Sequence, residues 1–104
     1  MTSVLSVGEV QTPLAVTYLK FLCKHFSTEI PVEYSETEGF AQFPFGKCRL
    51  SAETQTLTFH CEAENTTALD RMQEVIDKHV VMFTQRNPVI VIWRTHNLTE
   101  TSSY

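Results

Sequence analysis

The sequence predicts an α+β fold in which two helices pack on one face of a mainly antiparallel sheet. Two stretches of the chain repeat apolar residues at helical spacing, and the short stretches around them alternate apolar and polar residues as half-buried strands do. A run of short strands bracketed by two helices favours antiparallel strands with the helices on one side. The predicted order of elements is β-α-β-β-β-β-α-β.

The first strand and the first helix are separated by a helix-start signal. Residues 2–10 are predicted to be extended, with Leu5 and Val7 on one face. Thr12 is predicted to be the N-cap and Pro13 the first helical residue, where its missing N–H costs nothing. The helix predicted over residues 14–26 divides cleanly into two faces. Its apolar face carries Leu14, Ala15, Tyr18, Leu19, Leu22 and Phe26, and its polar face Thr17, Lys20, Lys24 and Ser27.

Three or four short strands are expected to follow. Residues 30–34 alternate apolar and polar side chains, and Pro31 indicates that this strand starts late or lies at an edge. Gly39 is predicted to mark the turn into the next strand. Residues 44–46 interrupt the ladder, and Gly46 is expected to supply an unusual backbone angle.

A register can be predicted for the hairpin between Cys48 and Cys61. With a turn centred on residues 54–55, Leu50 faces Phe59 and Cys48 faces Cys61, and the apolar residues of both strands fall on the inner side. Opposed side chains have Cβ atoms about 4.5–5.5 Å apart, which is near disulfide spacing. We interpret the two cysteines as small buried hydrophobes. Whether the facing pair has a redox role stays open.

The second helix is predicted to begin near residues 65–67 and to run to about Gln85. Its core stripe holds Leu69, Met72, Ile76, Val80 and Phe83. The unbroken apolar run over residues 89–93 predicts a strand that is covered on both faces or central in the sheet. All 104 residues are expected to form a single domain, 1–104, in which residues 97–104 are a loose tail.

Composition argues against several classes of partner. The net charge of −4 argues against a general nucleic-acid binder. Lys20, Lys24, Lys47 and Arg49 form a local basic grouping mixed with glutamates, which we interpret as a solvated surface; a small anion site is the alternative. Neither a secretory signal nor a membrane span is visible. An odd number of cysteines, three, favours reduced thiols and a cytoplasmic location.

The search for catalytic and metal-binding residues returns no site. Cys23 and His25 are two apart on a helix and point to nearly opposite sides, and His60 and Cys61 are neighbours on a strand, so neither pair can share a metal ion. His79 lies on the apolar face of the second helix and is interpreted as a hydrogen-bonded core or boundary residue. We therefore predict no metal, no cofactor and no catalytic residue.

Five residues are the candidate ligand or partner surface. His25 lies near a helix end, and Phe40 is the apolar anchor on an otherwise polar sheet face. Phe45 belongs to the rigid aromatic segment over residues 43–47 and either lines a pocket or plugs the core. Lys47 and Arg49 follow it and supply positive charge.

Several motifs resemble one bacterial family. They are Tyr18-Leu19-Lys20, Cys23-Lys24-His25-Phe26, Pro31-Val32-Glu33-Tyr34, and Phe43-Pro44-Phe45-Gly46-Lys47-Cys48. In this order and spacing, the chain resembles the domain-of-unknown-function family 2218. With residues 57–83 and 91–94 added, the resemblance covers nearly the whole chain. The element order is also similar to that of TATA-binding-protein-like domains, an analogy of fold alone.

The resemblance implies an accessory role in iron uptake. Members of the family often occur beside, or fused to, flavin reductases that act on ferric siderophores, so a siderophore-reducing flavoprotein or a small-molecule ligand is the implied partner. This chain departs from the family at two places. Residues 27–29 lack the second His or Lys common there, and Phe40 stands where a basic residue is frequent. Both departures weaken the case for a shared anion or iron-chelate site.

Three functional hypotheses follow. The first is a non-enzymatic binding or accessory domain, either a monomer or a dimer, that is linked to iron-siderophore handling. The second is a small enzyme that uses His25 as acid–base, with Tyr18 on the same helix face. The third is a homodimeric interaction module that buries the Phe40 face.

Overall fold

The elements follow the predicted order. The computed structural model describes residues 4–85 and 88–97. Along the chain these elements are β1 (Val4–Gln11), α1 (Ala15–Phe26), β2 (Val32–Tyr34), β3 (Glu38–Phe43), β4 (Gly46–Ala52), β5 (Thr56–Ala63), α2 (Thr66–Phe83) and β6 (Ile92–Asn97). The α+β class is confirmed.

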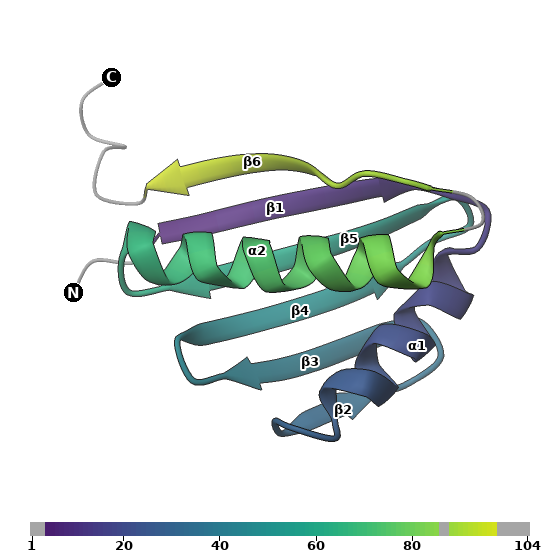
Figure 1. The fold of residues 1–104 in the computed structure, drawn as a ribbon, viewed down its shortest axis with the longest axis horizontal. Coiled ribbons are helices and arrows are strands. Elements are labelled where there is room, and N and C mark those ends of the chain that lie inside the picture. The colour runs from purple at the N-terminus through teal and green to yellow at the C-terminus, as the bar shows by residue number, and fades with distance from the viewer. Residues whose placement is uncertain (1–3, 86–87, 98–104) are drawn as a thin grey trace.

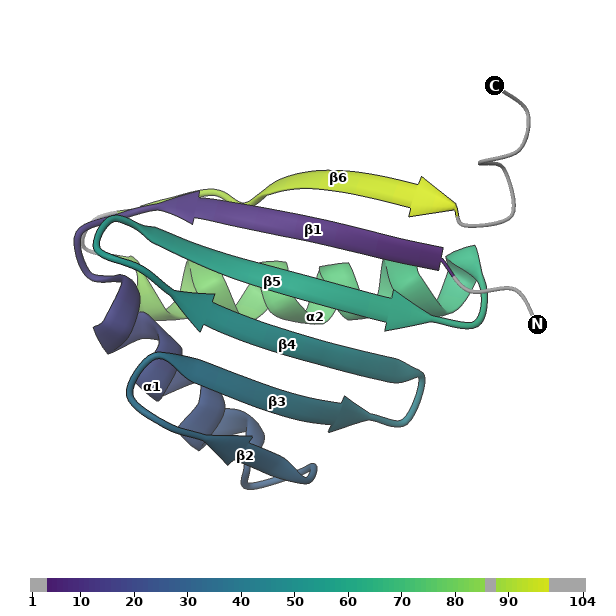
Figure 2. The same cartoon turned by 180° about the vertical axis from the view of Figure 1, so that it is seen from behind.

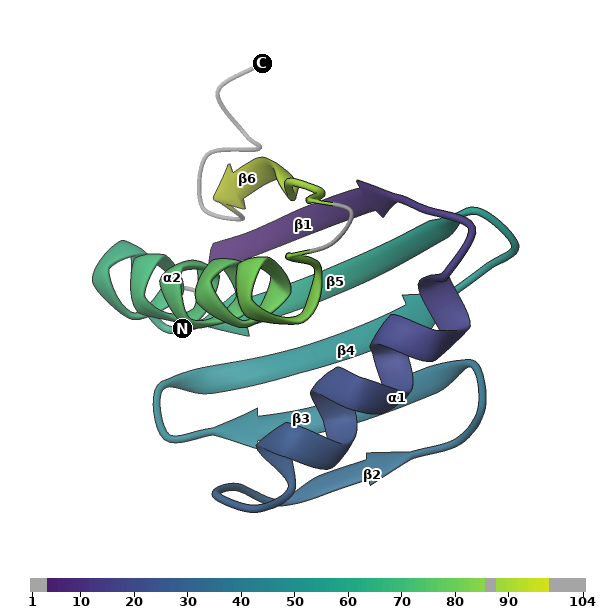
Figure 3. The same ribbon diagram turned by 45° about the vertical axis from the view of Figure 1, so that its right-hand side comes forward.

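The strands form one six-stranded sheet in the order β2-β3-β4-β5-β1-β6, and every neighbouring pair is antiparallel. Both helices lie on one face of this sheet (Figure 1), and the opposite face carries no helix (Figure 2). Helix α1 crosses β2 to β5, whereas α2 lies over β1, β4 and β5 (Figure 3). The described part of the chain is therefore a two-layer structure with one uncovered sheet face.

The core lies between the inner sheet face and the two helices, as expected for two layers that share one apolar interface. Alternate residues of β3, β4 and β5 are buried beneath the helices and the residues between them are more exposed. The predicted stripe of α2 is confirmed for Leu69, Met72, Ile76 and Val80, which are all buried. The largest fully buried side chains come from both layers: Phe59, Leu19, Leu22, Leu50, Leu57, Leu69, Met72 and Ile76.

The helix ends differ from prediction in detail. Leu14, not Thr12, occupies the N-cap position of α1. The Thr12 hydroxyl accepts a hydrogen bond from the Leu14 N–H at 3.1 Å, and this local turn places Pro13 before the helix. The predicted start of α2 is confirmed, with Asn65 Oδ1 accepting from the Ala68 N–H at 2.8 Å. Helix α2 ends at Phe83, because the Thr84 hydroxyl donates to the Val80 carbonyl at 2.7 Å and closes the last turn.

Two glycines have a different role from the one predicted. Gly39 lies inside β3 and Gly46 is the first residue of β4, and no described glycine has a positive φ. The predicted turn at Gly39 and the unusual angle at Gly46 are therefore wrong. A Cβ on Gly39 would overlap Cys23 Sγ of α1, and one on Gly46 would overlap the Glu62 carbonyl oxygen and lie 2.6 Å from Met72 Sδ. Both positions require glycine because neighbouring atoms occupy the side-chain space.

The last strand lies at the edge of the sheet, so the prediction of a central or doubly covered strand is wrong. Its only partner among the described strands is β1. The apolar run alternates: Val91 and Trp93 pack against the core, while Ile90 is 73% exposed and Ile92 is 55% exposed. The Trp93 indole N–H donates to Asp77 Oδ1 at 2.9 Å, which ties β6 to α2.

The predictions for the edge strand near Pro31 and for the tail can also be compared with the structure. The edge position and late start predicted from Pro31 are confirmed, since β2 begins at Val32 and pairs only with β3. The predicted tail over residues 97–104 is corrected at its first residue, because Asn97 belongs to β6. Residues 98–104 lie outside the described residues. Neither described helix is long and apolar enough to cross a membrane.

Candidate functional site

The uncovered face of the sheet contains a groove with a volume of about 590 Å³. We call it the sheet groove, and the side chains that matter below are Glu33, Phe40, Lys47, Arg49, His60 and Glu62. Pockets that bind small molecules typically measure about 300–1,000 Å³. The sheet groove is therefore large enough for a small ligand.

Strand pairing sets the order of side chains in this groove. Because alternate residues of β3, β4 and β5 are buried beneath the helices, Phe40, Arg49 and His60 point to the uncovered face. Phe40 pairs with Arg49 and Arg49 pairs with His60, so the three form one row across three strands. In the neighbouring row, Lys47 pairs with Glu62.

His60 is a titratable group of the groove whose pKa is lowered by its surroundings. Partial burial lowers the pKa of His60, and the positive charge of Arg49 lowers it further, while Glu9 on β1 acts in the opposite direction. Both dominant effects disfavour the imidazolium form. His60 is therefore a neutral imidazole near pH 7, and it can both donate and accept hydrogen bonds there.

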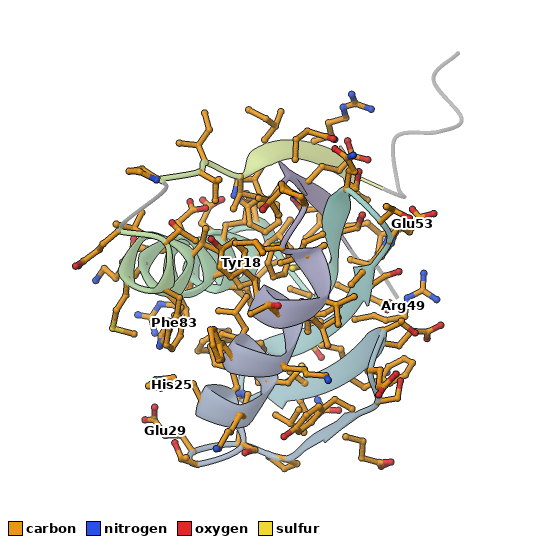
Figure 4. The ribbon with its side chains drawn as sticks, turned by 90° about the vertical axis from the view of Figure 1, so that its right-hand side faces the viewer. Tyr18, His25, Glu29, Arg49, Glu53 and Phe83 are labelled. Atoms are coloured by element: carbon orange, nitrogen blue, oxygen red, sulfur yellow. The ribbon has the colours of Figure 1, made fainter. Side chains whose placement is uncertain are left out.

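The five predicted surface residues do not form one surface. Phe40, Lys47 and Arg49 lie together in the sheet groove. His25 lies on the helix side, and Figure 4 shows His25 and Arg49 on opposite sides of the sheet. Phe45, in the β3–β4 turn, stacks on Phe43 with ring centroids 5.8 Å apart and planes at 18°. Since Phe43 is buried, Phe45 extends the core at its margin.

His25 belongs to an aromatic cluster where the two helices meet. Its ring centroid lies 4.7 Å from that of His79 and 5.6 Å from that of Phe83. The Nδ1 atom of His79 lies 2.7 Å from the Val75 carbonyl oxygen, so the interpretation of His79 as a hydrogen-bonded boundary residue is confirmed. The sequence reasoning placed each histidine on an apolar helix face but missed their contact, because only the crossing of the helices brings them together.

The geometry does not join Tyr18 and His25 into one acid–base site. Tyr18 is buried and lines a narrow apolar space with Val80 and Phe83. Seven residues separate Tyr18 from His25, which is about 10 Å along a helix axis. The two residues therefore lie about two helical turns apart on α1.

The cysteines are buried, and the predicted register of the β4–β5 hairpin is confirmed. Cys48 pairs with Cys61, and their Sγ atoms are 3.6 Å apart. The hydrogen bond from Cys61, then burial, holds the pKa of Cys48 well above its usual range, and burial raises the pKa of Cys23 to about 11. The thiols of Cys23 and Cys48 therefore stay protonated near neutral pH and are poor nucleophiles. Across residues 4–85 and 88–97, no three His, Cys, Asp or Glu side chains gather as metal ligands.

The sequence reasoning did not include His60 among the five candidate residues. The signal was present, because a register that opposes Leu50 to Phe59 also opposes Arg49 to His60. Glu33 was missed for a different reason. It enters the groove because β2 pairs with β3, and the pairing of such a short strand leaves little trace in sequence.

Comparisons with known proteins agree with this fold. A family model described as "Uncharacterized protein conserved in bacteria (DUF2218)" matches residues 7–94. The chain is also similar to the NMR structure of PA4090 from Pseudomonas aeruginosa, with a TM-score of 0.73 and 26% sequence identity. That similarity covers 90% of this chain and 96% of the other. A search of curated proteins found no match.

Proposed function

The chain belongs to the bacterial family DUF2218, and from that premise we propose that it is a small non-enzymatic domain that binds a ligand or partner in its sheet groove. The proposed process is iron-siderophore handling in the cytoplasm. The first candidates for the groove are a ferric siderophore and the flavoprotein that reduces it. This assignment to iron is supported by the association of family members with such reductases.

The observation that carries the proposal is the groove itself. It brings together three of the five residues expected from sequence, Phe40, Lys47 and Arg49, on the face that no described element covers. The one ion pair found among the described residues joins Lys78 to Glu74 on α2. Lys47 and Arg49 thus form no ion pair within that part of the chain, and Arg49 has no carboxylate directly opposite it on either neighbouring strand.

A thermal-shift screen of the purified protein tests the proposal. The panel contains ferric and iron-free siderophores, flavins, divalent metals and metabolite anions. A ligand present at a hundred times its dissociation constant adds about 2.7 kcal/mol to stability. For a domain of about 100 residues, that corresponds to a rise in melting temperature on the order of 10–20 °C. A rise with one chelate supports the proposal, and a flat panel contradicts small-molecule binding.

Two double variants locate the binding face. Lys47→Ala combined with Arg49→Ala removes two positive charges from the groove and is expected to abolish the thermal shift. Lys20→Ala combined with Lys24→Ala removes the same charge from the exposed side of α1 and serves as the matched control. If both pairs reduce the shift equally, general charge and not the groove explains the binding.

A second candidate function, homodimerisation through the uncovered face, is favoured by exposed apolar side chains. Phe40 is 54% exposed and Ile92 is 55% exposed, and both point to that face. Sedimentation analysis of the mass in solution tests this candidate. A dimer that dissociates on Phe40→Ser would support it, and a monomer at high concentration would exclude it.

A further inference from the structure

We infer that the sheet groove binds a small aromatic anion at Phe40, Arg49 and His60, and that its binding is coupled to proton uptake by His60. The inference rests on the proposed use of the groove and adds to it the chemical class of the ligand and a dependence on pH. It draws on the row of side chains, on their charges, and on the protonation of His60.

The row presents three complementary groups side by side. Directly opposed residues on an antiparallel pair have Cβ atoms about 4.5–5.5 Å apart. Phe40 and Arg49 are opposed on β3 and β4, and Arg49 and His60 are opposed on β4 and β5. A planar ligand that stacks on the exposed ring of Phe40 therefore brings an acidic substituent to the guanidinium of Arg49 and the imidazole of His60. Guanidinium groups bind carboxylates through paired, charge-assisted hydrogen bonds.

No carboxylate lies directly opposite Arg49 on either neighbouring strand, although Glu33 and Glu62 also line the groove. Lys47 is opposed by Glu62 across the ladder, so these two charges offset each other. Glu33 is opposed by Phe40, not by a basic residue. Arg49 is flanked by an aromatic ring and an imidazole, and it forms no ion pair within the described residues. The centre of the groove therefore favours a negatively charged ligand.

The same arrangement couples binding of an anion to protonation of His60. Arg49 helps to lower the pKa of His60, which keeps the imidazole neutral in the empty groove. The other charged groups on the same face near His60 are Lys47 on β4, Glu9 on β1, Glu62 further along β5, and Arg94 on β6, beyond Val7 in the same row. A bound anion would offset the field of Arg49 and make protonation easier. By thermodynamic linkage, protonated His60 must then bind the anion more tightly, by the same factor.

Salicylate and salicylamide are suitable probes because they share a ring and a hydroxyl group but only salicylate has a carboxylate. Both are titrated into the protein while amide correlation NMR spectra are recorded at about pH 5.5 and about pH 8, on either side of the usual histidine range. We expect salicylate to shift the amides of β3, β4 and β5. Its affinity is expected to be about three- to tenfold higher at the lower pH, and salicylamide to bind weakly at both.

Two variants separate His60 from general charge effects. In His60→Gln, the ratio of affinities at the two pH values is expected to fall to about one. In Arg49→Ala, salicylate binds more weakly at both pH values, and the ring signals of His60 titrate at higher pH because the opposing charge is gone. The pair Lys20→Ala and Lys24→Ala is the control and is expected to retain the wild-type ratio.

Three outcomes would overturn the inference. They are a wild-type affinity independent of pH, a pH dependence that survives in His60→Gln, and salicylate shifts outside the groove or absent altogether. Each is distinguishable from failure of the proposed function. If another ligand from the thermal panel binds the groove without pH dependence, the groove remains the binding site while the proton-coupled anion site is excluded.

Discussion

Replacing Gly39 by alanine tests the packing of α1 on the sheet. The added Cβ would overlap Cys23 Sγ, whereas its next neighbours, Tyr34 Cβ at 3.5 Å and Leu50 Cβ at 3.8 Å, are at ordinary contact distance. Cys23 is fully buried in α1, so its short side chain has little space to move away. Overpacking of this kind costs about 1–3 kcal/mol. We expect Gly39→Ala to lower the unfolding free energy by that amount.

The clash involves one side-chain atom, so removing that atom is expected to relieve it. Cys23→Ala alone loses the buried sulfur and costs about 1 kcal/mol. In the double variant, the methyl group of Ala at position 39 occupies the space that the sulfur has left. The double variant is therefore expected to be about as stable as Cys23→Ala, so the coupling energy between the two sites equals the cost of Gly39→Ala, about 1–3 kcal/mol.

Urea denaturation of the four proteins measures this cycle, and Gly46 supplies the control. Gly46→Ala would also overlap the backbone carbonyl of Glu62, which no side-chain truncation removes. Met72→Ala is therefore not expected to rescue Gly46→Ala. The reasoning is refuted if the losses at Gly39 and Cys23 simply add to within about 0.5 kcal/mol.

Three further predictions concern single groups. Asn65→Ala removes the cap of α2 and is expected to cost about 1 kcal/mol in urea denaturation, with Asn65→Asp as the retaining control. Cys23, with a pKa of about 11, has a thiolate fraction of about 10⁻³ at pH 8. A thiol reagent is therefore expected to label it only when the protein unfolds. Rapid labelling of the native protein would contradict this. Because the pKa of His60 is lowered in the fold, the unfolded chain takes up this proton more readily. Stability is therefore expected to fall as pH drops below about 6.5, and to fall less in His60→Gln; equal slopes of stability against pH would exclude this.

Periodicity explains why the helices and the β4–β5 hairpin could be predicted. The stripe from Leu69 to Val80 repeats at helical spacing over many residues, and few other structures bury such a pattern. The opposition of Cys48 and Cys61 followed from alternation on two adjoining strands, since a slip of one residue would turn both apolar sets outward. These features depend on local order, which a single sequence records.

Features set by distant partners could not be predicted in this way. Gly39 resembles a turn residue in sequence, but its lack of a side chain is required by Cys23 on α1. The run from Val89 to Trp93 resembles a central strand, but only its last two residues belong to a strand, the edge strand β6. Within the run, Val91 and Trp93 pack against the core while Ile90 and Ile92 are exposed. Both errors arise because local composition does not record which element packs against a segment.

The candidate site likewise combines features set by local order with features set by distant partners. Arg49 and His60 lie on one hairpin, so their opposition was implied by the register even though His60 was not selected. The separation of His25 from Arg49 could not be foreseen, because it depends on which face of the sheet the helices cover. Phe40, Lys47 and Arg49 are exposed whereas His25 and Phe45 are half-buried, and the fold decides which of these residues share a surface.

The position of β1 has a consequence for how the chain folds. Its two partners come much later in sequence: Val4 pairs with Ala63 on β5 and with Asn97 on β6. During synthesis, β1 would therefore emerge without a partner, while α1 and the strands from β2 to β5 could assemble from contacts closer in sequence. Contacts between residues distant in sequence slow folding. Until it is paired, β1 also leaves backbone and apolar groups open to association with other chains. Docking of β1 on β5, followed by pairing of β6 with β1, is expected to be the late step that completes the sheet.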